Sequence, residues 1–177
     1  MTDFVPADPA AFEVPLVENP FLDQLLESVP WTDEQIRQAK AFARDGYVVV
    51  DLESDDTDAL AERVIRDLAP HYGDATRLDE AWTFNPDVRA LTTARPVLDT
   101  LRRLYGREPI PFQTLNFRRG TEQALHSDTI HFHSLPGHFM AGVWIALEDM
   151  DDQRGTLRVI PGSHRLPTFA MEDMGLD

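Results

Sequence analysis

The chain changes character near Pro111, and this change restricts its possible folds more than any other feature. Before Pro111, apolar residues recur at helical spacing and helix-capping signals mark the ends of segments. After it, the segments PFQTLNFRR, ALHSDTIHF, FMAGVWIALED and TLRVIPG are rich in β-branched and aromatic residues. Helices followed by strands indicate an α+β domain with a mainly β core, in which helices pack on an antiparallel sheet or barrel.

The clearest predicted helix lies in WTDEQIRQAKAFARDG. Thr32 can cap its first turn, Gln35 can close a capping box, and Gly46 suits the position past its last turn. A second helix is predicted over residues 57–68, and a short buried strand at YVVVDL. Asn85-Pro86 and Arg95-Pro96 each indicate the start of a further helix, because proline is tolerated in the first turn. The helix that starts at Arg95-Pro96 is expected to end near Gly106.

We expect a single folded domain with a short extension at its N-terminal side. Residues 1–30 are rich in proline and acidic residues and show little periodicity, which predicts an irregular arm laid over the domain. Residues 31–177 then form the domain, a length that buries a substantial core.

The composition excludes several kinds of partner and chemistry. The formal net charge of −15 disfavours binding to nucleic acid or to an anionic membrane surface. The absence of cysteine excludes disulfides, thiolate nucleophiles and zinc–thiolate sites, so any bound metal uses nitrogen and oxygen ligands. The first residues, MTDFVPADPAAFEVP, lack a secretory signal, and we expect a cytoplasmic protein.

Three histidines and an aspartate are concentrated in the segment HSDTIHFH. On a strand, His126 and Asp128 point to one face, whereas His131 and His133 point to the other. The H-x-D pair can occupy two adjacent corners of an octahedron, as in the two-histidine, one-carboxylate triad of non-haem Fe(II) oxygenases. His126 and Asp128 are therefore the candidate metal ligands.

Other roles for these histidines stay open. The pair can be a strand-edge histidine with a nearby carboxylate, or the cluster can belong to a zinc hydrolase, although four groups on two faces do not converge on one ion. For His131 and His133 we favour aromatic packing or pocket lining. The remaining histidines are expected to have local roles. His71 suits the end of a helix, and His138 is expected to form a local hydrogen bond. His164 is expected to cap a turn or to form a salt link.

The segment FMAGVWIAL adds a possible ligand surface. Met140, Gly142, Trp144 and Ala146 share one face of a strand, and the opposite face, Phe139, Val143, Ile145 and Leu147, is expected to be core. Small residues on both sides of Trp144 leave room for a ligand against the indole. Packing of the indole against a helix is the equally weighted alternative.

Taken together, these segments resemble the phytanoyl-CoA dioxygenase family of Fe(II)/2-oxoglutarate oxygenases. The matching segments are DEQIRQAKAFARDGYVVV, FQTLNF, HSDTIHF, GVWIALEDM and GTLRVIPGSHRLP, in the family's order and at its spacing. The resemblance covers residues 33–167 and is strongest over 110–167.

The resemblance implies a double-stranded β-helix, or jelly roll, with N-terminal helices buttressing one sheet. It implies Fe(II) as metal, with His126 and Asp128 as ligands, and 2-oxoglutarate as cosubstrate, lying against Trp144. Gln113 and Asn116 correspond loosely to groups near the cosubstrate, although they point to opposite faces of a regular strand, so at most one faces it. The implied activity is hydroxylation of a small organic molecule or acyl derivative, since related halogenases lack the carboxylate of Asp128.

The family's third iron ligand, a histidine, and its 2-oxoglutarate-binding arginine follow the PGSH turn at some distance. Both are expected beyond residue 177, so the jelly roll and its metal site are incomplete in these residues. An inactive jelly-roll scaffold or binding module is the alternative function for a chain that lacks these groups.

Overall fold

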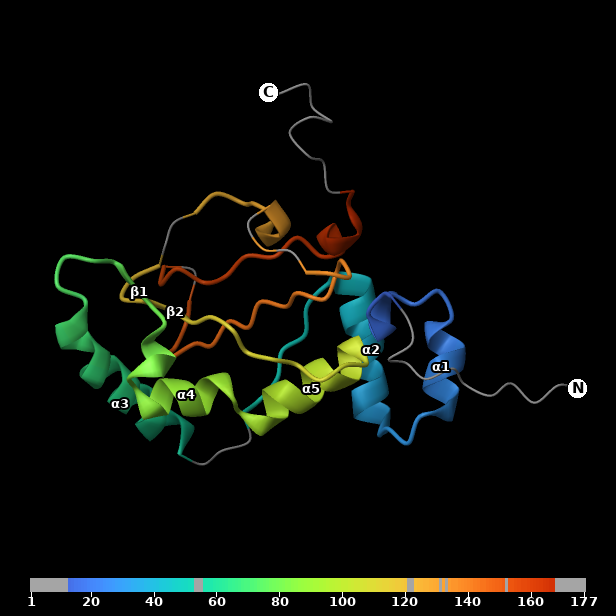
Figure 1. Ribbon diagram of the computed structural model, residues 1–177, viewed down its shortest axis with the longest axis horizontal. Coiled ribbons are helices and arrows are strands. Elements are labelled where there is room, and N and C mark those ends of the chain that lie inside the picture. The colour runs from blue at the N-terminus through green and yellow to red at the C-terminus, as the bar shows by residue number, and fades with distance from the viewer. Residues whose placement is uncertain are drawn as a thin grey trace, which may run out of the picture.

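The computed structural model describes residues 13–52, 56–120, 123–130, 132, 134–151 and 153–167. Helices α3, α4 and α5 lie along one side of the molecule, and extended segments from the second half of the chain lie along the other (Figure 1). The secondary structure combines helices with a small sheet, which confirms the α+β class.

The N-terminal region contains a helix that the sequence analysis did not predict. A 3-10 turn, η2 (Leu16–Glu18), is followed by α1 (Leu22–Ser28), so residues 13–30 are not the irregular arm that we expected. Residues 1–12 of the arm lie outside the described residues. Leu25 and Leu26 of α1 are buried, and this packing stabilises a helix too short to be stable alone.

Helix α2 (Asp33–Asp45) begins and ends where its capping residues predict. The Thr32 hydroxyl accepts a hydrogen bond from the backbone N–H of Gln35, and the side-chain oxygen of Gln35 accepts one from the backbone N–H of Thr32. Gly46 ends the helix with a φ of 83°, a left-handed conformation that favours glycine. The predicted capping box is therefore confirmed.

The remaining helices also match their sequence signals. Helix α3 (Thr57–Leu68) spans the predicted residues, and the Asn85 side chain caps α4 (Pro86–Thr92) by accepting from the Val88 amide. Helix α5 (Arg95–Tyr105) has proline in its first turn and ends at Gly106, again in a left-handed conformation. Short 3-10 turns are η3 (Ala69–His71), η4 (Ala81–Thr83), η5 (Asp128–Ile130) and η6 (Ser163–Arg165).

Two apolar clusters form the core. One joins α3 and α4 and consists of the buried residues Val64, Leu68, Tyr72, Ala81, Val88 and Leu91. The other joins α2 and α5 to the N-terminal turns and consists of Val17, Leu26, Ala39 and Leu104. Both clusters are formed by the helices and the short turns beside them, on which parts of the second half of the chain pack.

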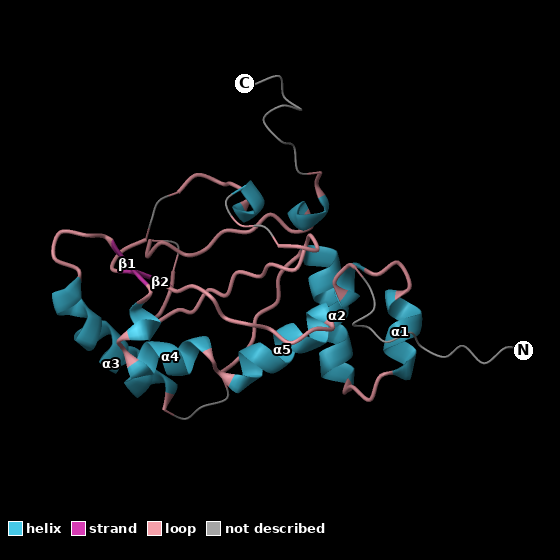
Figure 2. Cartoon of the chain, viewed as in Figure 1, coloured by secondary structure: helices cyan, strands magenta, loops and turns pink. Residues whose placement is uncertain are grey.

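The sheet of the described residues has two strands. β1 (Arg77–Asp79) pairs antiparallel with β2 (Leu115–Phe117), with Leu78 opposite Asn116. The other predicted strands, at 47–52, 124–132, 139–149 and 156–162, are not strands where the structure describes them; apart from the 3-10 turn η5, Figure 2 draws their described residues as loops. A strand needs a hydrogen-bonded neighbour, and these segments have no ladder partner here. The double-stranded β-helix therefore stays a prediction.

The second half is attached to the helices at a few points. Ile145 and Leu147 pack against the α3–α4 cluster, as the predicted core face requires, whereas Val143 on the same face is 48% exposed. The Tyr105 hydroxyl donates to the Met140 carbonyl at 3.0 Å. Burial raises the pKa of Tyr105 to about 12, so the phenol keeps its proton and acts as a donor across neutral pH.

The turn at residues 160–166 covers the C-terminal end of α2. The Gly162 amide donates to the Asp45 carbonyl at 2.8 Å, and the Arg165 guanidinium donates to the Arg44 carbonyl at 3.0 Å. The His164 ring lies 3.3 Å from the Ala43 carbonyl through Nε2, so a capping role for His164 is confirmed. These contacts join parts of the chain more than a hundred residues apart.

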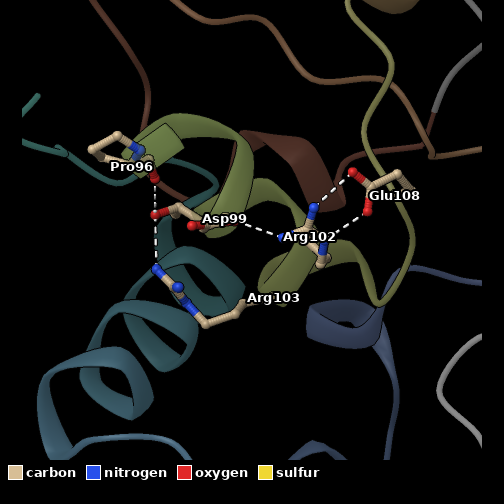
Figure 3. Close-up of polar contacts among 6 residues, drawn as sticks. Pro96, Asp99, Arg102, Arg103 and Glu108 are labelled. Carbon is tan, nitrogen blue, oxygen red and sulfur yellow. Dashed lines mark hydrogen bonds and ion pairs between the residues drawn. The ribbon is translucent and has the colours of Figure 1, made fainter. Parts of the chain in front are cut away.

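The end of α5 is tied to the segment that enters the second half. Arg102 forms two parallel hydrogen bonds of 2.6 Å with the Glu108 carboxylate and a third with Asp99, as Figure 3 shows. This charge-assisted, bidentate geometry fixes the direction of the chain after Gly106. In the described part of the chain, no helix has both the length and the apolar character that crossing a membrane requires.

Candidate metal centre

His126 and Asp128 lie close together, but not on a strand. His126 belongs to an irregular stretch, and Asp128 begins the 3-10 turn η5. His126 Nε2 lies 3.2 Å from Asp128 Oδ1. The predicted convergence of these side chains is confirmed, whereas the strand geometry from which we derived it is wrong. The two side chains meet just before and at the start of η5, where strand alternation was expected to bring them together.

The His126 ring is held in one orientation by the backbone. Its Nδ1 lies 2.7 Å from the Ala124 carbonyl oxygen, an acceptor, so Nδ1 carries the proton. In the neutral ring, Nε2 then presents a lone pair toward another acceptor, the Asp128 carboxylate. Two acceptors 3.2 Å apart need a cation between them, which is either a proton on Nε2 or a metal ion.

The same contacts explain the basicity of His126. The hydrogen bond to Ala124 is the largest cause that raises the pKa of the imidazole above its ordinary value. The negative charge of Asp128 and its hydrogen bond raise the pKa further, and partial desolvation opposes both effects. A more basic imidazole is also a stronger metal ligand once its proton is displaced.

The donor spacing fits a metal ion. Ligands about 2.1 Å from a metal on adjacent corners of an octahedron lie about 3.0 Å apart, close to the observed 3.2 Å. One imidazole nitrogen and one carboxylate oxygen match the donor types of non-haem Fe(II) sites. Among the described residues, no group of three or more His, Asp or Glu side chains is placed to share one ion.

The pair is accessible to solvent. The side chain of His126 is 36% exposed and that of Asp128 is 72% exposed. A metal held here has coordination positions open to water or to a small molecule. His131 and His133, for which we expected packing or pocket-lining roles, lie outside the described residues.

Comparison with known proteins shows to which family the chain belongs. The sequence pattern described as phytanoyl-CoA dioxygenase (PhyH) matches residues 26–176, most of the chain. The chain belongs to the phytanoyl-CoA dioxygenase family. The family assignment agrees with the resemblance seen in the sequence and makes the chain a member of a group of dioxygenases.

One curated relative is an ectoine dioxygenase from Sphingopyxis alaskensis. The two chains are 29% identical over 172 residues, which is 83% of this chain and 56% of the relative. The chain therefore spans little more than half the length of that relative. No solved structure matches the chain.

Trp144 lies in a segment that has no strand partner among the described residues. Gly142, two residues before it, approaches the Asp128 carboxylate. Trp144 itself is 47% exposed, so its indole is not fully packed against a helix. An indole with an open surface is available for a ligand, which is the role that the resemblance assigns to Trp144 and which stays a prediction.

Gln113 and Asn116 differ in their surroundings. Gln113 is exposed in the stretch before β2, whereas Asn116 is half-buried at the centre of β2. The Asn116 Oδ1 atom is buried and has no hydrogen-bond partner among the described residues. Buried polar atoms normally have a partner, so Asn116 is the better candidate of the two for contact with a cosubstrate.

A pocket of about 650 Å³ lies away from this pair. It opens between η2, the end of α2 and the 162–167 turn, and its polar lining includes Glu18, His138 and His164. His138 Nδ1 pairs with Glu18 Oε2 at 3.0 Å. Sequence analysis missed this pair because Glu18 lies in the region expected to be irregular, 120 positions from its partner. The pocket does not include either candidate metal ligand.

Proposed function

We propose that this chain provides the metal-binding part of an Fe(II)/2-oxoglutarate-dependent dioxygenase that hydroxylates a small organic molecule. The observation that carries the proposal is the convergence of His126 Nε2 and Asp128 Oδ1 at 3.2 Å, with the His126 ring oriented by Ala124. Membership of a dioxygenase family supports the same reaction class.

The proposed fold of the complete domain is the jelly roll that the resemblance implies. Apart from β2, the extended segments of the second half are rich in apolar residues, largely exposed and without ladder partners among the described residues. Such segments are suited to become inner strands once further strands pair with them. We propose that the third metal ligand and a 2-oxoglutarate-binding arginine come from sequence outside the described residues.

The role of the chain's own residues follows from their positions. Bound Fe(II) and 2-oxoglutarate would supply the oxidation, in which 2-oxoglutarate and dioxygen become succinate and carbon dioxide as the substrate is hydroxylated. His126 and Asp128 would hold the metal, with Ala124 fixing the imidazole tautomer. Trp144 would present a flat apolar surface that excludes water from one side of the cosubstrate. Asp128 occupies the position that halogenases leave open for halide, which favours hydroxylation.

The substrate is proposed only as a class. The relative's name refers to ectoine, and at 29% identity this supports a small organic substrate for the present chain and no particular compound. The net charge of −15 favours neither nucleic acid nor a polyanionic partner.

The test is succinate formation from 2-oxoglutarate under air, with and without Fe(II), by the full-length wild-type protein and two variants. Asp128→Ala removes a proposed ligand, and Asp149→Ala removes an exposed carboxylate elsewhere in the same half. We expect Fe(II)-dependent turnover that falls at least 100-fold in Asp128→Ala and is unchanged in Asp149→Ala. Equal turnover in both variants would rule out the ligand assignment.

An inactive binding module is the second candidate, because the described residues supply two converging metal ligands rather than three. Anaerobic titration with Fe(II) and 2-oxoglutarate separates the candidates. An oxygenase complex gives a weak visible charge-transfer band, whereas a module without a metal site gives none. Metal analysis of the purified protein would reveal the zinc that a hydrolase requires.

A further inference from the structure

Gly142 faces the candidate metal ligand Asp128. The Cβ atom of any side chain at position 142 would lie 3.9 Å from Asp128 Oδ2. Beyond the neighbours of Gly142 in the chain, no other described atom lies within 4 Å of that point. The space beside this carboxylate oxygen is therefore open on the Gly142 side.

Neither the backbone nor close packing requires glycine at this position. Gly142 is absent from the residues with positive φ, unlike Gly46 or Gly106, so an L-residue fits its backbone. A methyl group would make an ordinary van der Waals contact at 3.9 Å. Gly120 and Gly155 are different, because the Cα of each lies 3.0–3.1 Å from where the other's Cβ would be.

The open space lies beside a proposed metal ligand. Asp128 Oδ1 approaches His126 Nε2, and its second oxygen, Oδ2, lies toward Gly142. Trp144, with a half-exposed indole, follows two residues later. A metal held by Asp128, with any molecule bound to that metal, requires free volume next to the carboxylate, and Gly142 provides it.

We propose that Gly142 determines which ligands fit at this site, by keeping the volume beside Asp128 Oδ2 free for the metal and a metal-chelating 2-oxo acid. This inference rests on the proposed function and adds a residue to it. Gly142 touches neither the metal nor the reacting atoms; the absence of a side chain sets the size of the opening.

The proposal predicts a graded effect of side-chain size. Gly142→Ala adds a methyl at contact distance and should leave binding within about twofold of wild type. Gly142→Val adds two stiff branches beyond the Cβ atom, and at least one must enter the space around the carboxylate. Gly142→Leu is a second bulky variant. Both bulky variants should weaken binding at least tenfold.

Binding is measured with Mn²⁺, whose sharp electron paramagnetic resonance signal disappears when the ion binds protein. The titrations use the 177-residue protein, first with Mn²⁺ alone and then with Mn²⁺ and 2-oxoglutarate. Ala141→Val and Ala141→Leu are matched controls, because Ala141 is exposed and adjacent in the chain. Circular dichroism and the melting temperature verify that each variant is folded.

The outcomes separate this inference from the function beneath it. If wild type and Asp128→Ala bind Mn²⁺ equally, the proposed metal site is wrong and the role of Gly142 falls with it. If binding depends on Asp128 but Gly142→Val and Gly142→Leu bind as the Ala141 variants do, only the role of Gly142 is wrong. Weakening confined to the bulky Gly142 variants supports the inference.

Discussion

The two halves of the chain differ in how they bury apolar side chains. Every buried residue of the described chain lies between Pro15 and Leu104. After Leu104, no described residue is buried, and apolar side chains are widely exposed, with Ile110 at 81% and Leu135 at 96%. The first half is thus held by its own packing, and the second half depends on a few contacts with it.

This difference has a functional meaning. The candidate metal ligands lie in the second half, where side chains are accessible, while the packed helices lie in the first half. Sites on irregular segments positioned by a packed scaffold are common among enzymes. The exposed apolar side chains also mark surfaces that further strands would cover.

Matched leucine substitutions test the contrast most strongly. Leu104 is 1% exposed and Leu157 is 56% exposed. Leu104→Ala should lower the free energy of unfolding by about 2–5 kcal/mol because it leaves a cavity. Leu157→Ala should change it by less than about 0.5 kcal/mol. Urea denaturation measures both values, and equal losses would contradict the contrast between the halves.

Matched glycine substitutions test the contact between the turn at 160–166 and the end of α2. Gly46 and Gly73 both have positive φ, but a Cβ at Gly46 would lie 2.4 Å from His164 Nδ1, whereas one at Gly73 meets nothing within 4 Å. Gly73→Ala should lower the free energy of unfolding by about 1–2 kcal/mol, because alanine is strained in the left-handed backbone conformation. Gly46→Ala should lower the free energy of unfolding further, because the new methyl group must also displace the His164 ring from the end of α2.

The double variant Gly46→Ala/His164→Ala isolates the contact in the same denaturation experiment. Removing the ring should recover part of the loss caused by Gly46→Ala. Additive losses in the double variant would mean that the turn at 160–166 does not pack on α2 as described.

The Tyr105 hydrogen bond is a smaller link between the halves. Tyr105→Phe removes the hydroxyl that donates to the Met140 carbonyl, and it should lower the free energy of unfolding by about 0.5–1.5 kcal/mol. Tyr47→Phe, at a tyrosine that is 43% exposed, serves as control and should be near neutral. Hydrogen exchange around residue 140 should also accelerate in Tyr105→Phe, and unchanged exchange would argue against this link.

The ion pair between Arg102 and Glu108 should have the smallest effect, and the effect should depend on pH. The hydrogen bonds from Arg102 lower the pKa of Glu108. The ion pair therefore stabilises the folded protein fully at a pH above the ordinary glutamate pKa. This stabilisation is lost as the pH falls through the lowered pKa of Glu108 in the folded protein.

Melting temperatures of the wild type and Glu108→Gln should accordingly differ slightly at pH 7 and converge in acid. Glu62→Gln, at an exposed position of α3, is the control. A difference that persists in acid would show that the charge of Glu108 is not its source.

The helices could be predicted from the sequence because their signals are local. Thr32, Gln35 and Gly46 each act within one turn of the helix that they delimit. Helix α1 was missed because packing of Leu25 and Leu26, rather than capping, stabilises it. β2 lies within the predicted strand segment PFQTLNFRR, whereas β1 was not predicted, since its pairing with 115–117 depends on a partner far away in the chain.

The site was predictable in part for the same reason. The spacing of His126 and Asp128 indicated that the two side chains meet, although neither residue lies on a strand. The orientation of the ring by Ala124 and the approach of Gly142 depend on the folded backbone, so no sequence pattern marks them.

X-ray absorption at the iron edge tests the central claim most directly, because it detects imidazole bound to the metal. The protein is loaded anaerobically with Fe(II) as wild type, as His126→Ala, and as His164→Ala for a control histidine. We predict a nitrogen and oxygen shell with imidazole scattering that is lost in His126→Ala and retained in His164→Ala. Identical spectra for wild type and His126→Ala would contradict the assignment of His126 as a metal ligand.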